Sequence, residues 1–264
     1  MKQLTPAKKR KLLSSLKRYR RKYLQGKYNE LDESATRLMI NDFLSNVLGF
    51  ASLDEIKTEY MIRGTYADYV VQVKGKGCFI VEVKAMPLDL SEKHLRQAVN
   101  YAANGGIEWV LLTNGKRFNF YKIIFHKPIQ SKSVFSFDLS DEHHFKKAVE
   151  YLQYMTKKLI VNRGLDHLWY RVSALDPQNV SRLLFSKSIV RNLRRQLKKM
   201  YRSNFNENDI NAALTRVAEE KIENVHQCRE RKSRKRHKNI RKPVPPSVSM
   251  PVLNGGQVIN KSLQ

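Results

Sequence analysis

Hydrophobic positions follow two different periods along the chain. From Thr5 to Gln25 and from Asp32 to Gly49, apolar residues recur every three to four positions, which is typical of amphipathic helices. Further along, short runs rich in aromatic and β-branched residues alternate with a period of two, which indicates strands. The predicted strands are residues 56–62, 66–73, 78–84, 109–113, 117–125 and 134–137, with a helix over residues 91–106 between the third and the fourth. This order predicts an α/β fold.

Turn residues separate the predicted strands. Lys74-Gly75-Lys76-Gly77 predicts a hairpin between the second and third strands. Asn114-Gly115 predicts a type I′ hairpin between the fourth and fifth strands, because both residue types tolerate a positive φ.

The remainder of the chain has mostly helical spacing. Helices are expected over residues 141–160, 177–201 and 210–225, and the Pro- and Gly-containing stretch from residue 242 has too little apolar pattern to fold alone. Four segments follow from these shifts in composition. They are a basic amphipathic helix (1–29), an α/β domain (30–138), a helical region (139–228) and a basic, Pro-containing disordered tail (229–264).

Charge is distributed very unevenly. The formal net charge is +26, and residues 1–30 (eleven Lys/Arg, one acid) and 229–242 (nine and one) supply +10 and +8 of it. Such blocks attract polyanions, so nucleic acid is the first expected partner, with a solvated face, an anionic membrane or an acidic protein as alternatives. The expected nucleic-acid-binding residues are Arg191, Arg194, Arg195, Lys198, Lys199, Arg231, Lys232, Arg234, Lys235 and Arg236.

Several classes of protein are excluded. No run of 18 apolar residues exists, so a membrane-spanning helix is not expected. The two cysteines, Cys78 and Cys228, lie far apart and give neither a disulfide framework nor zinc spacing. We therefore expect a soluble, cytoplasmic protein without a membrane partner.

Candidate chemistry lies on the first predicted hairpin. Pairing its strands about Gly75 places Asp68 opposite Glu82, and alternation puts Glu82 and Lys84 on one face of the sheet. The neighbouring residues are apolar on both faces, which predicts that these charges are buried. Two adjacent buried carboxylates repel each other unless a cation holds them both ionised.

A divalent metal ion resolves this repulsion. Mg²⁺, or Mn²⁺, accepts one or two carboxylates and retains positions for water and a phosphate oxygen. Asp68 and Glu82 are the expected ligands, together with the backbone carbonyl of Val83. Lys84 is placed to orient the attacking water and to stabilise developing negative charge, as in a phosphodiesterase.

At this point the sequence resembles the PD-(D/E)xK nucleases, and among them the N-terminal nuclease domain of the motor subunits of type I restriction enzymes. Asp68 matches the lone Asp of that family and Glu82-Val83-Lys84 matches its ExK motif. Gln97 and Tyr101 match its QxxxY element, and Glu33 its additional acid. The resemblance covers residues 30–125 and implies a mixed sheet flanked by helices, here with a C-terminal helical region.

The resemblance implies a Mg²⁺-dependent endodeoxyribonuclease, with restriction of foreign DNA as the suggested role. The sequence contains no GxxxxGK[ST] phosphate loop, so a motor or specificity subunit would be a separate chain. The alternative is a nucleic-acid-binding or accessory subunit that retains the nuclease fold without turnover. RNA as the substrate and a homodimeric assembly are left open.

Overall fold

The computed structural model describes residues 3–62, 64–217 and 219. The chain divides into two compact units, Met1–Val180 and Ser181–Gln264, and the division falls within one short helix. The predicted tail over residues 229–264 lies outside the described residues. No helix in the described part of the chain is long and apolar enough to cross a membrane.

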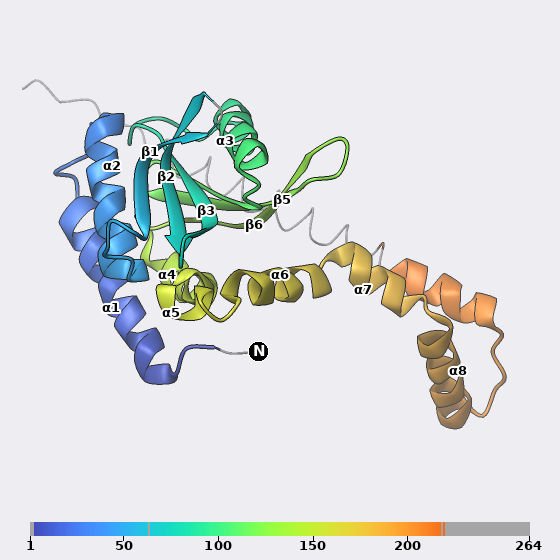
Figure 1. Cartoon of the computed structure of the whole chain (residues 1–264). Coiled ribbons are helices and arrows are strands. Elements are labelled where there is room, and N and C mark those ends of the chain that lie inside the picture. Colours follow the sequence, from blue (N-terminus) through green and yellow to red (C-terminus); the bar gives the residue numbers. More distant parts are fainter. Residues whose placement is uncertain (1–2, 63, 218, 220–264) are drawn as a thin grey trace, which may run out of the picture. The chain divides into compact units, whose positions relative to one another are not determined.

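The first unit is organised around a six-stranded mixed sheet in which the strands lie in sequence order (Figure 1). Neighbouring strands are antiparallel except β3 and β4, which are parallel. Helix α3 connects these two strands, because a parallel pair requires a crossover. The strands are β1 (Ile56–Ile62), β2 (Thr65–Val73), β3 (Lys76–Val83), β4 (Trp109–Thr113), β5 (Arg117–Ile124) and β6 (Gln130–Asp138).

Both faces of the sheet are covered by helices. On one face, Tyr69, Val81 and Val83 belong to a core shared with α1 (Pro6–Tyr23), α2 (Glu33–Asp42) and α4 (Phe145–Leu152). On the other face, Val70, Ile80 and Val110 pack with Ala98 and Ala102 of α3 (Glu92–Gly105). The predicted α/β core is therefore confirmed, and so is the burial of the central strands from both sides.

The β2–β3 hairpin combines a tight turn with a bulge. Lys74 (φ 51°) and Gly75 (φ 74°) both have positive φ, as a type I′ turn requires. Next to the turn Gln72 pairs with Gly77, but beyond it Val71 pairs with Phe79, so β3 contains one extra residue, Cys78. Beyond the bulge, residues at equal distances from Gly75 pair with each other, which is the predicted register.

The second predicted helix is α2 extended by a π-helical turn over Phe43–Leu48, and Gly49 (φ 86°) ends it. Asp32 caps its start by accepting a 2.7 Å hydrogen bond from the backbone N–H of Ala35. Leu38 lies outside the apolar face of this helix, because its side chain is 74% exposed. The buried stripe lies one position away and contains Met39, Ile40, Phe43 and Leu44.

Two long helices predicted after the sheet are each interrupted. The expected helix over residues 141–160 is divided into a 3-10 turn (Glu142–His144), α4, a second 3-10 turn (Gln153–Met155) and α5 (Lys157–Ile160), with extended backbone at Thr156 (ψ 143°). The helix expected over residues 177–201 breaks at Ser186 (ψ 144°). It forms α7 (Pro177–Leu184) and α8 (Lys187–Tyr201), and α6 (Gly164–Ala174) precedes them.

The second unit is helical in its described part. Helix α8 is followed by a helix over residues 207–217, which begins three residues before the expected start at residue 210. Asn206 and Asp209 cap this helix reciprocally, each side chain accepting a hydrogen bond from the backbone N–H of the other residue. Val190 of α8 and Ile210 are buried.

The contrast between Ile40 and Leu38 gives a test of the helix register. Ile40→Ala should lower the free energy of unfolding by about 2 to 5 kcal/mol, because the side chain is fully buried. Leu38→Ala should change it by no more than about 0.5 kcal/mol. Urea denaturation of both variants measures these values, and equal losses would contradict the register described here.

Candidate active site

Asp68 and Glu82 lie where the pairing of β2 with β3 ends, close enough for each charge to act on the other. The last pair is Tyr69 with Val81, and one further step in this register is the predicted pair of Asp68 with Glu82. The backbone N–H of Val83 donates a 2.7 Å hydrogen bond to Oδ2 of Asp68. The Asp68 carboxylate is therefore held against the strand that carries Glu82.

Lys84 directly follows β3, which ends one residue earlier than predicted. Its backbone N–H donates to the carbonyl of Thr113 at the end of β4, so the parallel pairing continues to this residue. Its ammonium lies 2.7 Å from Oε1 of Glu82 and 3.5 Å from Oε2 of Glu33 on α2. Two predicted acids thus contact the predicted lysine.

The segment after Lys84 is tied to the two neighbouring elements. The backbone N–H of Met86 donates to the carbonyl of Leu31, just before α2. The buried Asn114 side chain donates to the carbonyl of Leu88 at 2.8 Å and accepts from the N–H of Arg117 at 2.8 Å. These bonds bring the start of α2, with Glu33, beside the end of β3.

The type I′ turn predicted at Asn114-Gly115 is not formed. Three residues separate β4 from β5, and only Gly115 among them has a positive φ (82°). Asn114 instead closes the turn with its side chain, as asparagine does in turns of this kind. The hairpin itself is present, with Thr113 paired to Phe118.

Arg37 is a site residue that sequence reasoning missed. Its guanidinium lies 3.3 Å from Oδ1 of Asp68 and 3.3 Å from Oε1 of Glu59. The hydroxyl of Tyr69 donates a 2.6 Å hydrogen bond to its backbone carbonyl. The available signal was its position four residues after Glu33, which places both side chains on one helical face.

Burial dominates the electrostatics of the two carboxylates. Glu82 is 2% exposed, and loss of hydration raises its pKa to about 7 despite the hydrogen bond from Lys84. Burial also raises the pKa of Asp68, opposed by the Val83 N–H and by Lys84. For Lys84, burial acts to lower the pKa, but Glu82 and the other nearby carboxylates outweigh it, so the pKa is raised.

The carboxylates fit a divalent metal ion in one specific respect. Oε2 of Glu82 is buried and has no hydrogen-bond partner among the described residues. Such an orphaned carboxylate oxygen is costly unless something binds it. The described part of the chain contains no group of three or more His, Cys, Asp or Glu side chains arranged for a metal. Asp68, Glu82 and a backbone carbonyl form a smaller set, which Mg²⁺ accepts because it retains several water ligands.

Gln97 and Tyr101 lie on the same face of α3, as their spacing predicts. The side-chain amide of Gln97 donates a 2.7 Å hydrogen bond to the Tyr101 hydroxyl. The Tyr101 ring is buried against the sheet among residues that include Ala67 and Ile80. In the first turn of α3, burial and the charge of Lys84 lower the pKa of His94.

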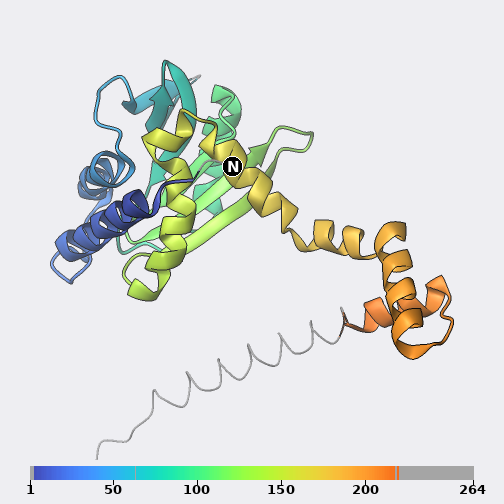
Figure 2. The same ribbon diagram turned by 90° about the horizontal axis from the view of Figure 1, so that it is seen from below.

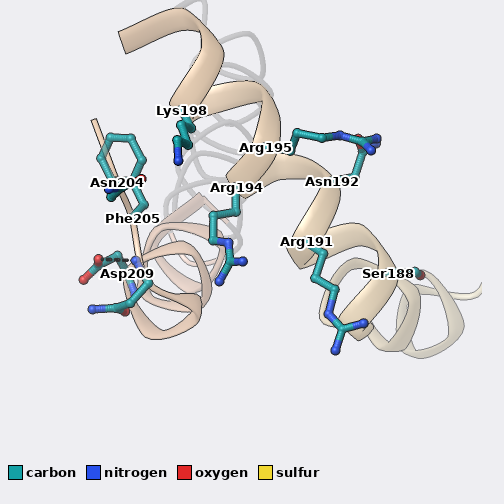
Figure 3. A pocket seen from close by; sticks show the side chains of 10 residues that line it. Ser188, Arg191, Asn192, Arg194, Arg195, Lys198, Asn204, Phe205 and Asp209 are labelled. Atoms are coloured by element: carbon teal, nitrogen blue, oxygen red, sulfur yellow. Dashed lines mark hydrogen bonds between the residues drawn. The ribbon is translucent and has the colours of Figure 1, made fainter. Parts of the chain in front are cut away.

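Four of the five basic residues predicted on α8 border a pocket of about 900 Å³ within the second unit. Figure 3 shows Arg194 and Lys198 projecting from α8 toward the segment that carries Phe205 and Asp209. The lining also includes Arg191 and Arg195 but not Lys199. The remaining predicted cations, Arg231, Lys232, Arg234, Lys235 and Arg236, lie outside the described residues.

Comparison with known proteins identifies one related family. Residues 32–132 match the family described as the N terminus of the type I restriction enzyme R protein. The matched segment runs from Asp32, which caps α2, into β6. It therefore contains the candidate active-site residues Glu33, Arg37, Asp68, Glu82, Lys84, Gln97 and Tyr101. No curated protein and no solved structure matches the chain. The predicted resemblance of this segment is confirmed.

Loss of the Asn114 side chain should destabilise the first unit. Asn114→Ala leaves the carbonyl of Leu88 and the N–H of Arg117 without their partner, so the free energy of unfolding should fall by about 1 to 3 kcal/mol. Asn100→Ala, on the exposed side of α3, is the matched control and should change it by less than about 0.5 kcal/mol. Denaturant unfolding measures both, and unchanged stability of Asn114→Ala would contradict this role.

The raised pKa of Glu82 predicts a pH-dependent stability in EDTA. The folded-state pKa of about 7 exceeds the ordinary value of 4.5, so the folded state retains this proton more strongly than the unfolded state. The resulting contribution is fully present below pH 4.5 and is lost as the pH rises through 7. Unfolding of the wild type should therefore become easier over this range relative to Glu82→Gln. Exposed Glu92→Gln should follow the wild type, and parallel profiles for Glu82→Gln and the wild type would contradict the shift.

Proposed function

We propose that residues 30–138 form a metal-dependent endonuclease that hydrolyses phosphodiester bonds in DNA. The observation that carries this proposal is the convergence of Asp68, Glu82 and Lys84 at one end of the sheet, with a buried Glu82 oxygen that has no partner in the described part of the chain. The match of residues 32–132 to the N terminus of a restriction enzyme subunit supports the same conclusion. It also favours DNA as the substrate and restriction of foreign DNA as the role.

Two carboxylates would hold the metal ion. Asp68 and Glu82 lie on adjacent strands, and the Val83 carbonyl is the third proposed ligand. A bound Mg²⁺ or Mn²⁺ would polarise the scissile phosphate and lower the pKa of a coordinated water. In the hydrolysis, the oxygen of water bonds to phosphorus, the phosphorus bond to the leaving oxygen breaks, and that oxygen takes up a proton.

Lys84 supplies the positive charge that the reaction needs beside the carboxylates. Its ammonium is held by Glu82 and Glu33, so its position is defined before substrate binds. A fixed ammonium stabilises the negative charge that grows on the phosphate oxygens, and it can orient the attacking water. Glu33 therefore acts as a positioning residue for Lys84, and Arg37 has the same role for Asp68.

Gln97 and Tyr101 are proposed to contact the substrate from α3. Their mutual hydrogen bond leaves the Gln97 carbonyl oxygen available, while Tyr101 fixes the orientation of the amide. Arg191, Arg194, Arg195, Lys198 and Lys199 of α8 are proposed to bind the DNA backbone, together with the basic residues of the tail.

Plasmid cleavage tests the proposal directly. The purified protein should nick or cut supercoiled DNA at ~50 mM salt, where electrostatic binding is strong, with Mg²⁺ or Mn²⁺ but not in EDTA. Asp68→Asn, Glu82→Gln and Lys84→Ala should each reduce cutting at least about 100-fold and leave DNA affinity nearly unchanged. Glu92→Gln is the matched control, because this carboxylate is exposed on α3 and should not affect cutting.

Calorimetry separates this function from the alternative of a binding subunit. The wild type should bind Mn²⁺, and Glu82→Gln should not. DNA binding that persists without cutting and without metal binding would favour the non-catalytic subunit. Faster cutting of an RNA of the same sequence would identify RNA as the substrate, and wild-type cutting by Asp68→Asn would overturn the assignment of the site.

A further inference from the structure

A second basic pocket lies in the first unit, between α1, the π-helical turn and the start of α5. It has a volume of about 900 Å³. Figure 2 shows α1, in dark blue, beside the yellow-green segment that contains α4 and α5. The backbone N–H of Leu4 donates to the side chain of Gln153, which holds the start of the chain against this segment.

Most of the charge in this pocket is uncompensated. Five cations line it and no Asp or Glu does. Lys157 forms an ion pair with Glu55. The other four cations form no ion pair with a carboxylate within the described residues, and they are Lys8, Lys11, Arg18 and Lys158.

Two of these cations are close enough to repel each other. The Lys8 ammonium lowers the pKa of Lys158, because a neighbouring positive charge disfavours protonation. Both side chains are exposed and have room to separate. An anion placed between them would replace this repulsion with two attractive interactions, and Ser14 and Ser15 add hydroxyl donors to the same pocket.

Lys8, Lys11 and Arg18 form a row along α1, and the length of this row indicates which kind of anion it can bind. Lys8 and Arg18 are ten residues apart on α1, which corresponds to about 15 Å along the helix axis. One phosphate group can contact only one end of this row. Phosphates along one strand of a duplex advance about 3.4 Å each along its axis, so the row is as long as roughly four phosphate steps.

One continuous helix, formed by α2 and the π-helical turn, runs from the candidate active site to the pocket. Glu33 and Arg37 lie at the beginning of α2, and Asn46 lines the pocket at the far end of the π-helical turn. Thirteen residues separate Glu33 from Asn46, which is about 20 Å of helix.

We propose that this pocket binds the phosphate backbone of nucleic acid at a distance from the point of cleavage. The proposal rests on the function proposed above, since that function supplies the nucleic-acid partner. The pocket would act as a clamp that is separate from α8 and has no part in the chemistry. It would make productive binding depend on the length of the duplex.

The test compares two triple variants that remove the same number of charges. Lys8→Ala/Lys11→Ala/Lys158→Ala removes cations that line the pocket, whereas Arg10→Ala/Lys17→Ala/Arg21→Ala removes three cations of α1 that do not line it. Binding of a duplex of about 25 base pairs is followed by fluorescence anisotropy in EDTA at several salt concentrations. Circular dichroism verifies that both variants are folded, as expected because the replaced side chains are exposed.

The pocket variant should bind at least about 10-fold more weakly at 100 mM salt, and its slope of log affinity against log salt should fall by about 2 to 3. The control variant should bind within about threefold of the wild type. Equal losses in both variants would overturn the proposal in favour of diffuse charge. Unchanged duplex binding, with pocket-dependent binding of phosphatidylserine vesicles instead, would identify a membrane surface and would also overturn it.

The readout is independent of the nuclease proposal. Binding in EDTA does not require cutting, so the comparison can be repeated with Lys84→Ala present in every protein. A specific loss of affinity in the pocket variant would support the clamp even if plasmid cleavage were absent. Metal-dependent cleavage with equal affinity of both triple variants would retain the nuclease and exclude the clamp.

Discussion

The arrangement of the charged residues at one end of the sheet depends on the burial of the Glu82 carboxylate. A carboxylate that is 2% exposed is costly unless cations and donors surround it. Lys84 supplies the cation, and the backbone of β4 fixes Lys84 through Thr113. Asp68 is held by the Val83 N–H and by Arg37. The strand pairing, the α2 helix and the crossover through α3 thus all contribute to the position of one buried charge.

The parallel pairing of β3 and β4 is what joins these parts. It places the end of β4 beside Lys84, and Asn114 then holds the segment that follows β3. The same segment contacts Leu31, which directs the first turn of α2 toward the site. Residues more than 25 positions apart in sequence therefore determine where Glu33 and Lys84 meet. The hairpin alone would supply Asp68 and Glu82 but would not place the lysine.

Apolar alternation and turn residues were sufficient to predict the strands and to bring Asp68 near Glu82, whereas the flanking of the sheet by helices was implied by the family resemblance. They did not predict that Arg37 contacts Asp68. A charged residue on a half-exposed helix gives the same sequence pattern whether its side chain faces solvent or pairs with a buried acid. The breaks at Thr156 and Ser186 were missed because helical apolar spacing continues through both positions. Asn114 was misassigned because its side chain, and not its backbone, forms the turn.

The bulge at Cys78 has a consequence for folding. Without it, the two-residue turn would extend a register in which Asp68 faces Val81 and Glu82 faces Ala67. A shift of one residue exchanges the two faces of a strand. Both faces of β2 and β3 are apolar, so hydrophobic burial discriminates only weakly between the two registers, and the charged residues must supply much of the difference. A hairpin without the bulge would therefore pair the same two strands but would separate Asp68 from Glu82, so the bulge is what brings the two carboxylates together.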